Sequence, residues 1–166
     1  MLYDTLLKQV TNQEILAILG HEIGHWALWH TIQGFVIMQA YTFVLFATFA
    51  FVQSNKALSA AFGFHFGNDP APIIIGLTLF TSTYWTPVDN VLKFLLNINS
   101  RRNEFAADRY GKKLGYAKDL ASGLIKLQIE NLGNMVPDPL YSTYHYTHPP
   151  LVERLVPLED QDKKSK

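Results

Sequence analysis

The sequence predicts an all-α protein with polytopic membrane helices. Residues 26–55 contain no Asp, Glu, Lys or Arg, and within them residues 35–52 form an apolar run interrupted by one glutamine and two threonines. Eighteen helical residues span about 27 Å, close to the hydrocarbon thickness of a bilayer. A second apolar stretch covers residues 73–96, and the remaining C-terminal part is polar with helical spacing of its leucines. We therefore expect two membrane spans followed by helices outside the membrane.

The first helix is expected over residues 11–30. Thr11-Asn12-Gln13-Glu14 has the pattern of a capping box, in which Thr11 caps the helix and Glu14 reaches back to it. A helix that begins there can run through His25 and continue into the first span, residues 31–53.

His21-Glu22-Ile23-Gly24-His25 is the HExxH pattern of a zinc-metalloprotease catalytic segment. Histidines four residues apart project from one helical face, about 40° apart, so both imidazoles can reach one metal ion. Glu22 lies about 100° from His21 and about 60° from His25, at the edge of that face. There it can reach a water molecule at the metal without being a ligand, as a general base must. The alternative is a helix that carries two histidines by coincidence.

The chain contains no cysteine, so the metal must be held by nitrogen and oxygen atoms. Two histidines and one carboxylate, with a fourth position open for water, form a known catalytic zinc site. Glu104 and Asp108 lie four residues apart, again on one helical face. We expect Glu104 to bind the single zinc ion and Asp108 to hold the outer nitrogen of a ligand histidine. The alternative is a solvated acidic face whose ion-pair partners are arginines.

In the second apolar stretch, residues 73–96, Pro87 should kink the helix, and Asp89 and Lys93 must pair or face protein or water. Residues 54–72 read as the loop between the spans, with several turn signals. Two spans joined by a loop return to the same membrane face, which would bring the two histidines and the glutamate together. Buried helices of a soluble core remain the alternative.

The expected orientation of the chain in the membrane follows from the distribution of its lysines and arginines. The loop carries only Lys56, whereas residues 93–126 carry eight lysines and arginines. By the positive-inside rule, the zinc side faces the cytosol. The formal net charge is zero and no basic stripe is present, which argues against nucleic acid as a partner.

Residues 97–166 are expected to form the cytosolic zinc-site and C-terminal helices. Residues 118–132 form an amphipathic pattern that ends at Gly133. His148 precedes two prolines that suit the first turn of a last helix. His145, flanked by tyrosines, is expected to be a packing residue. His30 would lie about 180° from His21 on one continuous helix, so we expect it to pack at the interface rather than to share the metal.

Three segments together resemble the CAAX prenyl protease 1 family. They are His-Glu-Ile-Gly-His-Trp, then Ser-Arg-Arg-Asn-Glu-Phe-Ala-Ala-Asp, then His-Tyr-Thr-His-Pro-Pro-Leu-Val-Glu-Arg, in the family's order. The resemblance implies a multi-pass zinc endopeptidase of the endoplasmic reticulum membrane that removes the last three residues of prenylated CAAX proteins. It also implies the roles of six residues: zinc ligands His21, His25 and Glu104, catalytic base Glu22, supporting carboxylate Asp108, and His148 facing the substrate carbonyl.

The resemblance further implies a ring of seven membrane helices, of which this sequence contains the last two and the catalytic segments. The expected partners are prenylated CAAX proteins or peptides, membrane lipid, and the preceding spans or a partner chain that supplies them. We expect the isolated chain to bind zinc poorly and to be inactive. The alternatives are another membrane zinc protease of the same superfamily, or an inactive fragment with a scaffold role.

Overall fold

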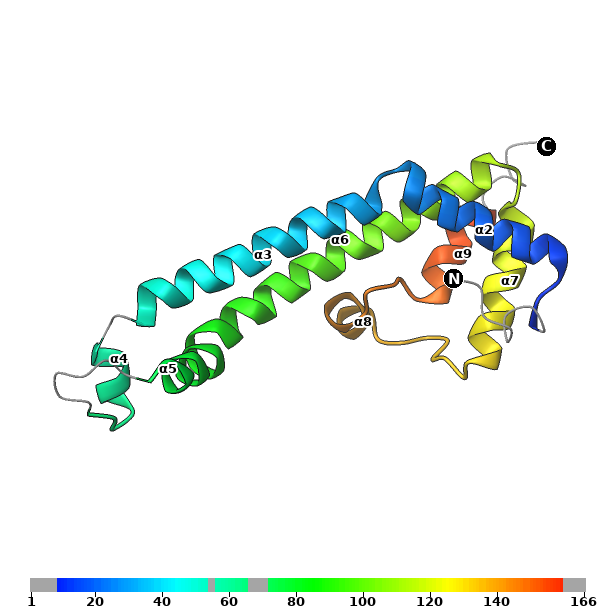
Figure 1. Cartoon of the computed structure of the whole chain (residues 1–166). Coiled ribbons are helices and arrows are strands. Elements are labelled where there is room, and N and C mark those ends of the chain that lie inside the picture. The colour runs from blue at the N-terminus through cyan, green and yellow to red at the C-terminus, as the bar shows by residue number, and fades with distance from the viewer. Residues whose placement is uncertain (1–8, 54–55, 66–71, 160–166) are drawn as a thin grey trace. The chain divides into compact units, whose positions relative to one another are not determined.

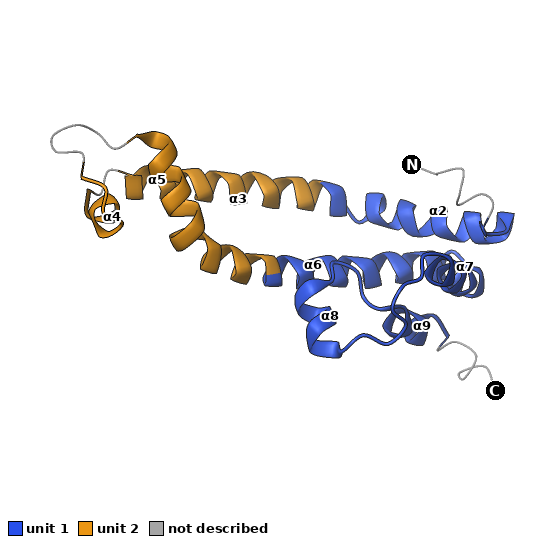
Figure 2. Cartoon of the chain, turned by 90° about the horizontal axis from the view of Figure 1, so that it is seen from below, with its two compact units in different colours: residues 1–31, 94–166 blue, residues 32–93 orange. Residues whose placement is uncertain are grey.

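A computed structural model describes residues 9–53, 56–65 and 72–159. All regular elements in this described part are helices, so the predicted all-α class is confirmed. The chain divides into two compact units (Figures 1 and 2). Unit 1 comprises residues 1–31 and 94–166, and unit 2 comprises residues 32–93. The elements, labelled as in Figure 1, are α2 (Asn12–Ala27), α3 (His30–Gln53), α4 (Lys56–Ala61), α5 (Ile73–Leu79), the π-helix η1 (Phe80–Trp85), α6 (Thr86–Lys113), α7 (Ala117–Glu130), α8 (Pro139–His145) and α9 (Leu151–Glu159).

The start of α2 confirms the predicted capping box. The backbone N–H of Glu14 donates to Thr11 Oγ1, and the backbone N–H of Thr11 donates to Glu14 Oε2 at 2.7 Å. The end of this helix differs from the prediction. α2 stops at Ala27, and Trp29 adopts the left-handed conformation with φ of 62° before α3 begins at His30. A single helix from residue 11 into the first span is therefore wrong, because a left-handed residue interrupts the helical hydrogen bonds.

The core of unit 1 lies where α7 packs against α2 and α9. Ala17, Leu120 and Leu158, one from each helix, are almost fully buried there. Leu120 therefore lies on the buried face of the amphipathic helix expected over residues 118–132. After the C-terminal end of α7, Leu132 adopts a positive φ of 52°. Gly133, the predicted end of this helix, follows it directly in the sequence.

Unit 2 contains α3, which is long and apolar enough to cross a bilayer, with a mean hydropathy of 2.0 over its best window. In the described ranges it is the one helix that meets this test. Residues 73–96 are helical throughout, but they are divided among α5, η1 and the first part of α6. The π-helix η1 ends immediately before the first turn of α6, and that turn contains Pro87. A π-helix and a proline are both features at which a helix can bend. The second span therefore stays a prediction.

Polar groups within unit 2 are paired. Tyr41 donates to Asp89 Oδ1 at 2.7 Å and accepts from Trp85 Nε1 at 3.1 Å. Lys93 Nζ lies 2.6 Å from Asp89 Oδ2, so the predicted pair is present. The predicted loop contains the short helix α4 and a turn at Gly63, whose φ is 79°. Its other turn signals, in residues 54–55 and 67–70, lie outside the described residues.

A buried carboxylate joins α2 to α7. Glu14 is 3% exposed; its Oε1 accepts from Ser122 Oγ at 2.6 Å and lies 2.7 Å from Lys126 Nζ. Burial alone would raise the pKa of Glu14, but the hydrogen bonds from Lys126, Ser122 and Thr11 outweigh it and lower the pKa from 4.5 to about 2. Because its pKa is lowered on folding, Glu14 stabilises the fold above pH 4.5, and this stabilisation is lost as the pH falls towards 2.

Glu14→Gln should therefore make stability less dependent on pH. We expect its melting temperature to fall less than that of the unchanged chain between about pH 5 and about pH 3, since the amide does not titrate. At neutral pH the variant should be less stable by about 1–3 kcal/mol. Thermal unfolding at several pH values measures both effects, with the exposed Glu130→Gln as control. Identical pH profiles for all three proteins would contradict the role of Glu14.

Candidate metal centre

Gly24 sets the distance between α2 and α6. A Cβ atom built on Gly24 would lie 3.0 Å from Tyr110 Cβ and 3.2 Å from Ala107 Cα. Ala107 is fully buried, and Gly24 is also buried. The two helices thus approach as closely as a residue without a side chain permits. Because Gly24 lies between His21 and His25, the contact falls inside the HExxH segment itself.

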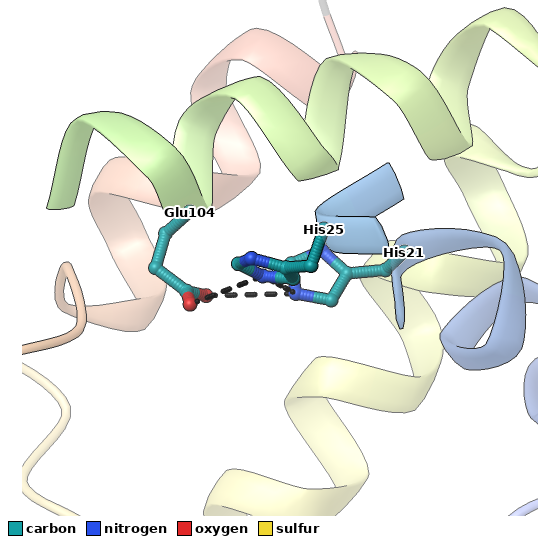
Figure 3. Close-up of side chains that lie close together, drawn as sticks. All are labelled: His21, His25 and Glu104. Atoms are coloured by element: carbon teal, nitrogen blue, oxygen red, sulfur yellow. Dashed lines mark hydrogen bonds and ion pairs between the residues drawn. The ribbon is translucent and has the colours of Figure 1, made fainter. Parts of the chain in front are cut away.

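This contact brings His21 and His25 of α2 next to Glu104 of α6, as Figure 3 shows. The two Nε2 atoms are 3.1 Å apart. Glu104 Oε2 lies 3.6 Å from His21 Nε2, and Oε1 lies 3.3 Å from His25 Nε2. Ligands at about 2.0–2.2 Å from a tetrahedral zinc ion are separated by about 3.3–3.6 Å. The spacing and the chemistry of these three groups therefore fit a zinc ion.

Asp108 lies behind His21. Its Oδ1 is 2.9 Å from His21 Nδ1, although the ring N–H is not aligned well enough to make a hydrogen bond. Arg154 of α9 donates to both carboxylate oxygens of Asp108, at 2.8 and 2.7 Å. Burial would raise the pKa of Asp108, but the hydrogen bonds from Arg154 and the contact with His21 lower it. Asp108 is therefore a buried carboxylate anion held against the outer nitrogen of His21.

Arg154 forms an ion pair with Asp108. Its Nη1 is also 3.5 Å from Glu104 Oε2, so one guanidinium faces both carboxylates of α6. The sequence around Arg154 could not have revealed these two carboxylate partners, because they lie about 50 residues away in the chain. The pair anchors α9 directly behind the metal centre.

His148 lies on the open side of Glu104. Its Nδ1 is 3.1 Å from Glu104 Oε1, and its side chain is 66% exposed. The hydrogen bond with Glu104 raises the pKa of His148, burial opposes this, and the charge of exposed Glu22 adds a smaller raising contribution. Burial would raise the pKa of Glu104, but hydrogen bonds from His148 and His25 lower it well below its usual range. The structure thus brings His148 to the cluster, together with the charge of Glu22.

Arg101 holds the segment that carries His148. Its Nη1 donates to the Ser142 carbonyl at 3.3 Å, and its Nη2 donates to Glu153 Oε2 at 2.6 Å. Arg101 therefore ties α6 to the residues on both sides of His148. From the sequence, arginines were possible ion-pair partners of the acidic face of this helix. The acceptors that Arg101 actually contacts were not predicted, because both are distant in sequence. His145 instead stacks with tyrosine rings of α8, as expected of a packing residue.

Gly24→Ala should disturb the metal centre. The added methyl group must push α2 away from α6, and overpacking of this kind costs about 1–3 kcal/mol. We expect zinc affinity, measured by competition with a chelator, to fall about tenfold or more. Gly20→Ala, one turn earlier, is the control, because its Cβ would lie 3.5 Å from the side chains of Leu114 and Tyr116, an ordinary contact. Equal zinc affinity in the two variants would show that the helix contact does not set the ligand spacing.

The chain is similar to known peptidases over nearly its whole length. The family model described as peptidase family M48 matches residues 1–162. The CAAX prenyl protease 1 homolog of Oryza sativa subsp. japonica is 48% identical over 99% of this chain and 38% of its own length. The human homolog is 50% identical over 89% of this chain and 30% of its own length. The resemblance inferred from the three motifs is thus confirmed.

A solved structure supports the fold. The crystal structure of S. mikatae Ste24p matches with a TM-score of 0.84 and 41% sequence identity, over 95% of this chain and 39% of that chain. The CAAX prenyl protease 1 of Saccharomyces cerevisiae is 41% identical over all of this chain, and the chain spans 30–39% of the length of these three curated relatives. Family M48 is a family of metallopeptidases, which implies a metal ion. On the match over residues 1–162, the chain belongs to peptidase family M48.

Proposed function

We propose that this chain is the catalytic part of a zinc metalloendopeptidase that removes the C-terminal tripeptide of prenylated CAAX proteins. The observation that carries the proposal is the convergence of His21, His25 and Glu104 on one point beside exposed Glu22 and His148. The substrate class rests on the names of the relatives, which are CAAX prenyl protease 1 homologs. Because the chain spans 38% and 30% of those relatives' length, the activity and the substrate class are both part of the proposal.

The metal-binding residues are His21, His25 and Glu104. Two neutral imidazoles and one carboxylate are the ligand set of many catalytic zinc sites. Bound zinc supplies Lewis-acid chemistry, since it acidifies a coordinated water and polarises a carbonyl group. Asp108 lies 2.9 Å from the outer nitrogen of His21, and its negative charge favours the tautomer that is protonated there, whose Nε2 is free to bind a metal. Arg154 keeps Asp108 ionised for this task.

Glu22 is the general base in this proposal. It belongs to the same turn of α2 as His21 yet is not part of the cluster of ligand atoms, and its side chain is exposed. It can therefore take the proton from the attacking water and later pass it to the leaving amine. His148 is the donor to the substrate carbonyl oxygen. Its Nδ1 atom lies 3.1 Å from Glu104 Oε1 and its side chain is 66% exposed, so it is at the edge of the cluster where a substrate carbonyl can reach it.

The peptide is expected to bind beside His148. A cavity of about 400 Å³ adjoins this residue and is lined by the end of α7, the segment between α8 and α9, and the start of α9. Its lining includes Gln128, Asn134, Tyr146 and Thr147, whose polar groups can pair with a peptide backbone. An open cavity next to a proton donor is a suitable position for the residues that flank a scissile bond.

We further propose that the protein lies in the endoplasmic reticulum membrane with its zinc side in the cytosol. The apolar helix α3 supports membrane insertion, and the excess of lysine and arginine in residues 93–126 supports the orientation. A cytosolic site is where prenylated protein tails would be available.

Glu22→Gln tests the reaction. The assay follows cleavage of a prenylated CAAX peptide by a fusion protein, in which the N-terminal part of the Saccharomyces cerevisiae relative precedes this chain. We expect the variant to lose turnover by at least about 10²-fold, because a positioned general base contributes about 10²- to 10⁴-fold. Zinc content, measured by elemental analysis, should stay at about one per chain because Glu22 is not a ligand.

A chelator should abolish cleavage by the unchanged fusion protein, and zinc should restore it. Full activity of Glu22→Gln would contradict the role of this residue. Chelator-resistant cleavage, or no cleavage of any prenylated peptide while zinc is bound, would contradict the proposed function. Strong chelator-sensitive cleavage by the isolated chain would show that the preceding spans are unnecessary.

His148→Ala tests the carbonyl donor. Loss of one donor to a developing oxyanion typically costs about 10²- to 10³-fold in turnover, and we expect that range with zinc occupancy intact. His145→Ala is the comparison variant: His145 lines the same cavity but contacts Tyr141 and Tyr144 rather than the cluster, so we expect any effect in KM and little loss of kcat. Both variants are measured on one prenylated peptide. A larger loss of kcat for His145→Ala would assign the role to His145.

A further inference from the structure

His30 contacts a proposed zinc ligand from behind. Its Nδ1 atom lies 3.0 Å from His25 Nδ1, and the two rings meet edge to face with centroids 5.0 Å apart. The other nitrogen of His25, Nε2, is the one that faces Glu104 and His21. His30 therefore contacts the side of His25 that points away from the metal-binding position. His30 is not part of the group of ligand atoms, and its expected packing at the interface stays a prediction to which this contact is added.

The break between α2 and α3 makes this contact possible. On a continuous helix, residues five apart are separated by about 140°, so His30 would point away from His25. The turn at Leu28 and Trp29 redirects the chain and turns His30 back towards His25. Trp29 adopts a φ of 62°, which costs a bulky residue about 1–2 kcal/mol. Its side chain is 69% exposed, so burial within the protein does not offset this cost.

Strained backbone next to a ligand residue is typical of functional sites. Here the strained residue is followed directly by the histidine that completes the contact. Each proposed ligand histidine then has a polar group behind its Nδ1 atom, although only His25 makes a hydrogen bond there. His21 Nδ1 faces the carboxylate of Asp108, and His25 Nδ1 faces the imidazole of His30.

We propose that His30 is a positioning residue of the metal centre, which accepts a hydrogen bond from His25 Nδ1–H and so fixes the tautomer and ring orientation of that ligand. This inference rests on the proposed zinc site. When His25 Nε2 binds a metal, Nδ1 carries the proton and needs an acceptor. His30 supplies one through its unprotonated Nδ1, provided that its own proton is on Nε2. The left-handed Trp29 is the backbone feature that holds the acceptor in place.

Zinc affinity tests the proposal independently of catalysis. Zinc dissociation constants are measured by chelator competition for the fusion protein, unchanged and with His30→Ala, His30→Asn or His65→Ala. We expect His30→Ala to weaken binding about 10- to 100-fold, because loss of a hydrogen-bond partner of a ligand histidine has effects of that size. His30→Asn should recover most of the affinity, since its side-chain carbonyl oxygen can occupy the position of Nδ1 and accept the same bond. His65→Ala, in unit 2, should have no effect.

The outcomes separate the two proposals. If the unchanged protein binds no zinc, the proposed function fails and this inference fails with it. If that protein binds zinc and His30→Ala binds it equally well, the inference alone is overturned. Equal weakening in His30→Ala and His30→Asn also overturns it, because His30 would then only fill space. Should His30→Ala fail to fold, His30→Lys replaces it, since an ammonium group donates but cannot accept, and the same weakening is expected.

Discussion

The contact between Gly24 and Ala107 is the constraint on which the metal centre depends. The ligand histidines belong to α2 and the ligand carboxylate belongs to α6, so no single helix can build the site. The spacing of α2 and α6 is fixed where Gly24 leaves room for the backbone of α6, with Tyr110 Cβ 3.0 Å from the position a Cβ would take. A side chain at residue 24 would push α2 away from α6 in the segment that carries both histidines.

Buried charge organises the surroundings of that contact. Asp108 and Arg154 pair between α6 and α9, while Glu14 joins α2 to α7 through Ser122 and Lys126. Buried ion pairs contribute little net stability against apolar packing, but removal of one partner is costly. Such pairs therefore fix which helices meet and in which register. In unit 1 one pair ties α6 to α9 and the other ties α2 to α7, and the apolar core of α2, α7 and α9 supplies the packing between these helices.

Local patterns in the sequence predicted much of this arrangement. The spacing of His21, Glu22 and His25 requires only helical geometry, and the capping box at Thr11 is equally local. The prediction that Glu104 is the third ligand followed from the absence of cysteine and from its helical spacing with Asp108. The bilayer-length apolar helix was evident from composition, although the structure begins it at His30 after a break.

The features that were missed depend on tertiary structure or on unusual backbone geometry. Arg101 and Arg154 have partners about 40–50 residues away, and only folding shows which acidic group each arginine meets. The break before His30 had no glycine or proline to signal it, because Trp29 itself adopts the left-handed conformation. Leu132 likewise has the positive φ that Gly133 was expected to take.

X-ray absorption at the zinc edge, recorded on the fusion protein, tests the metal centre most directly. A site made of His21, His25 and Glu104 predicts only nitrogen and oxygen neighbours at about 2.0–2.2 Å, with the outer scattering of two imidazole rings. Glu104→Gln should change the oxygen contribution and leave both imidazole signals in place. Three imidazole rings per zinc, or a spectrum unaffected by Glu104→Gln, would contradict a site built from the contact of α2 with α6.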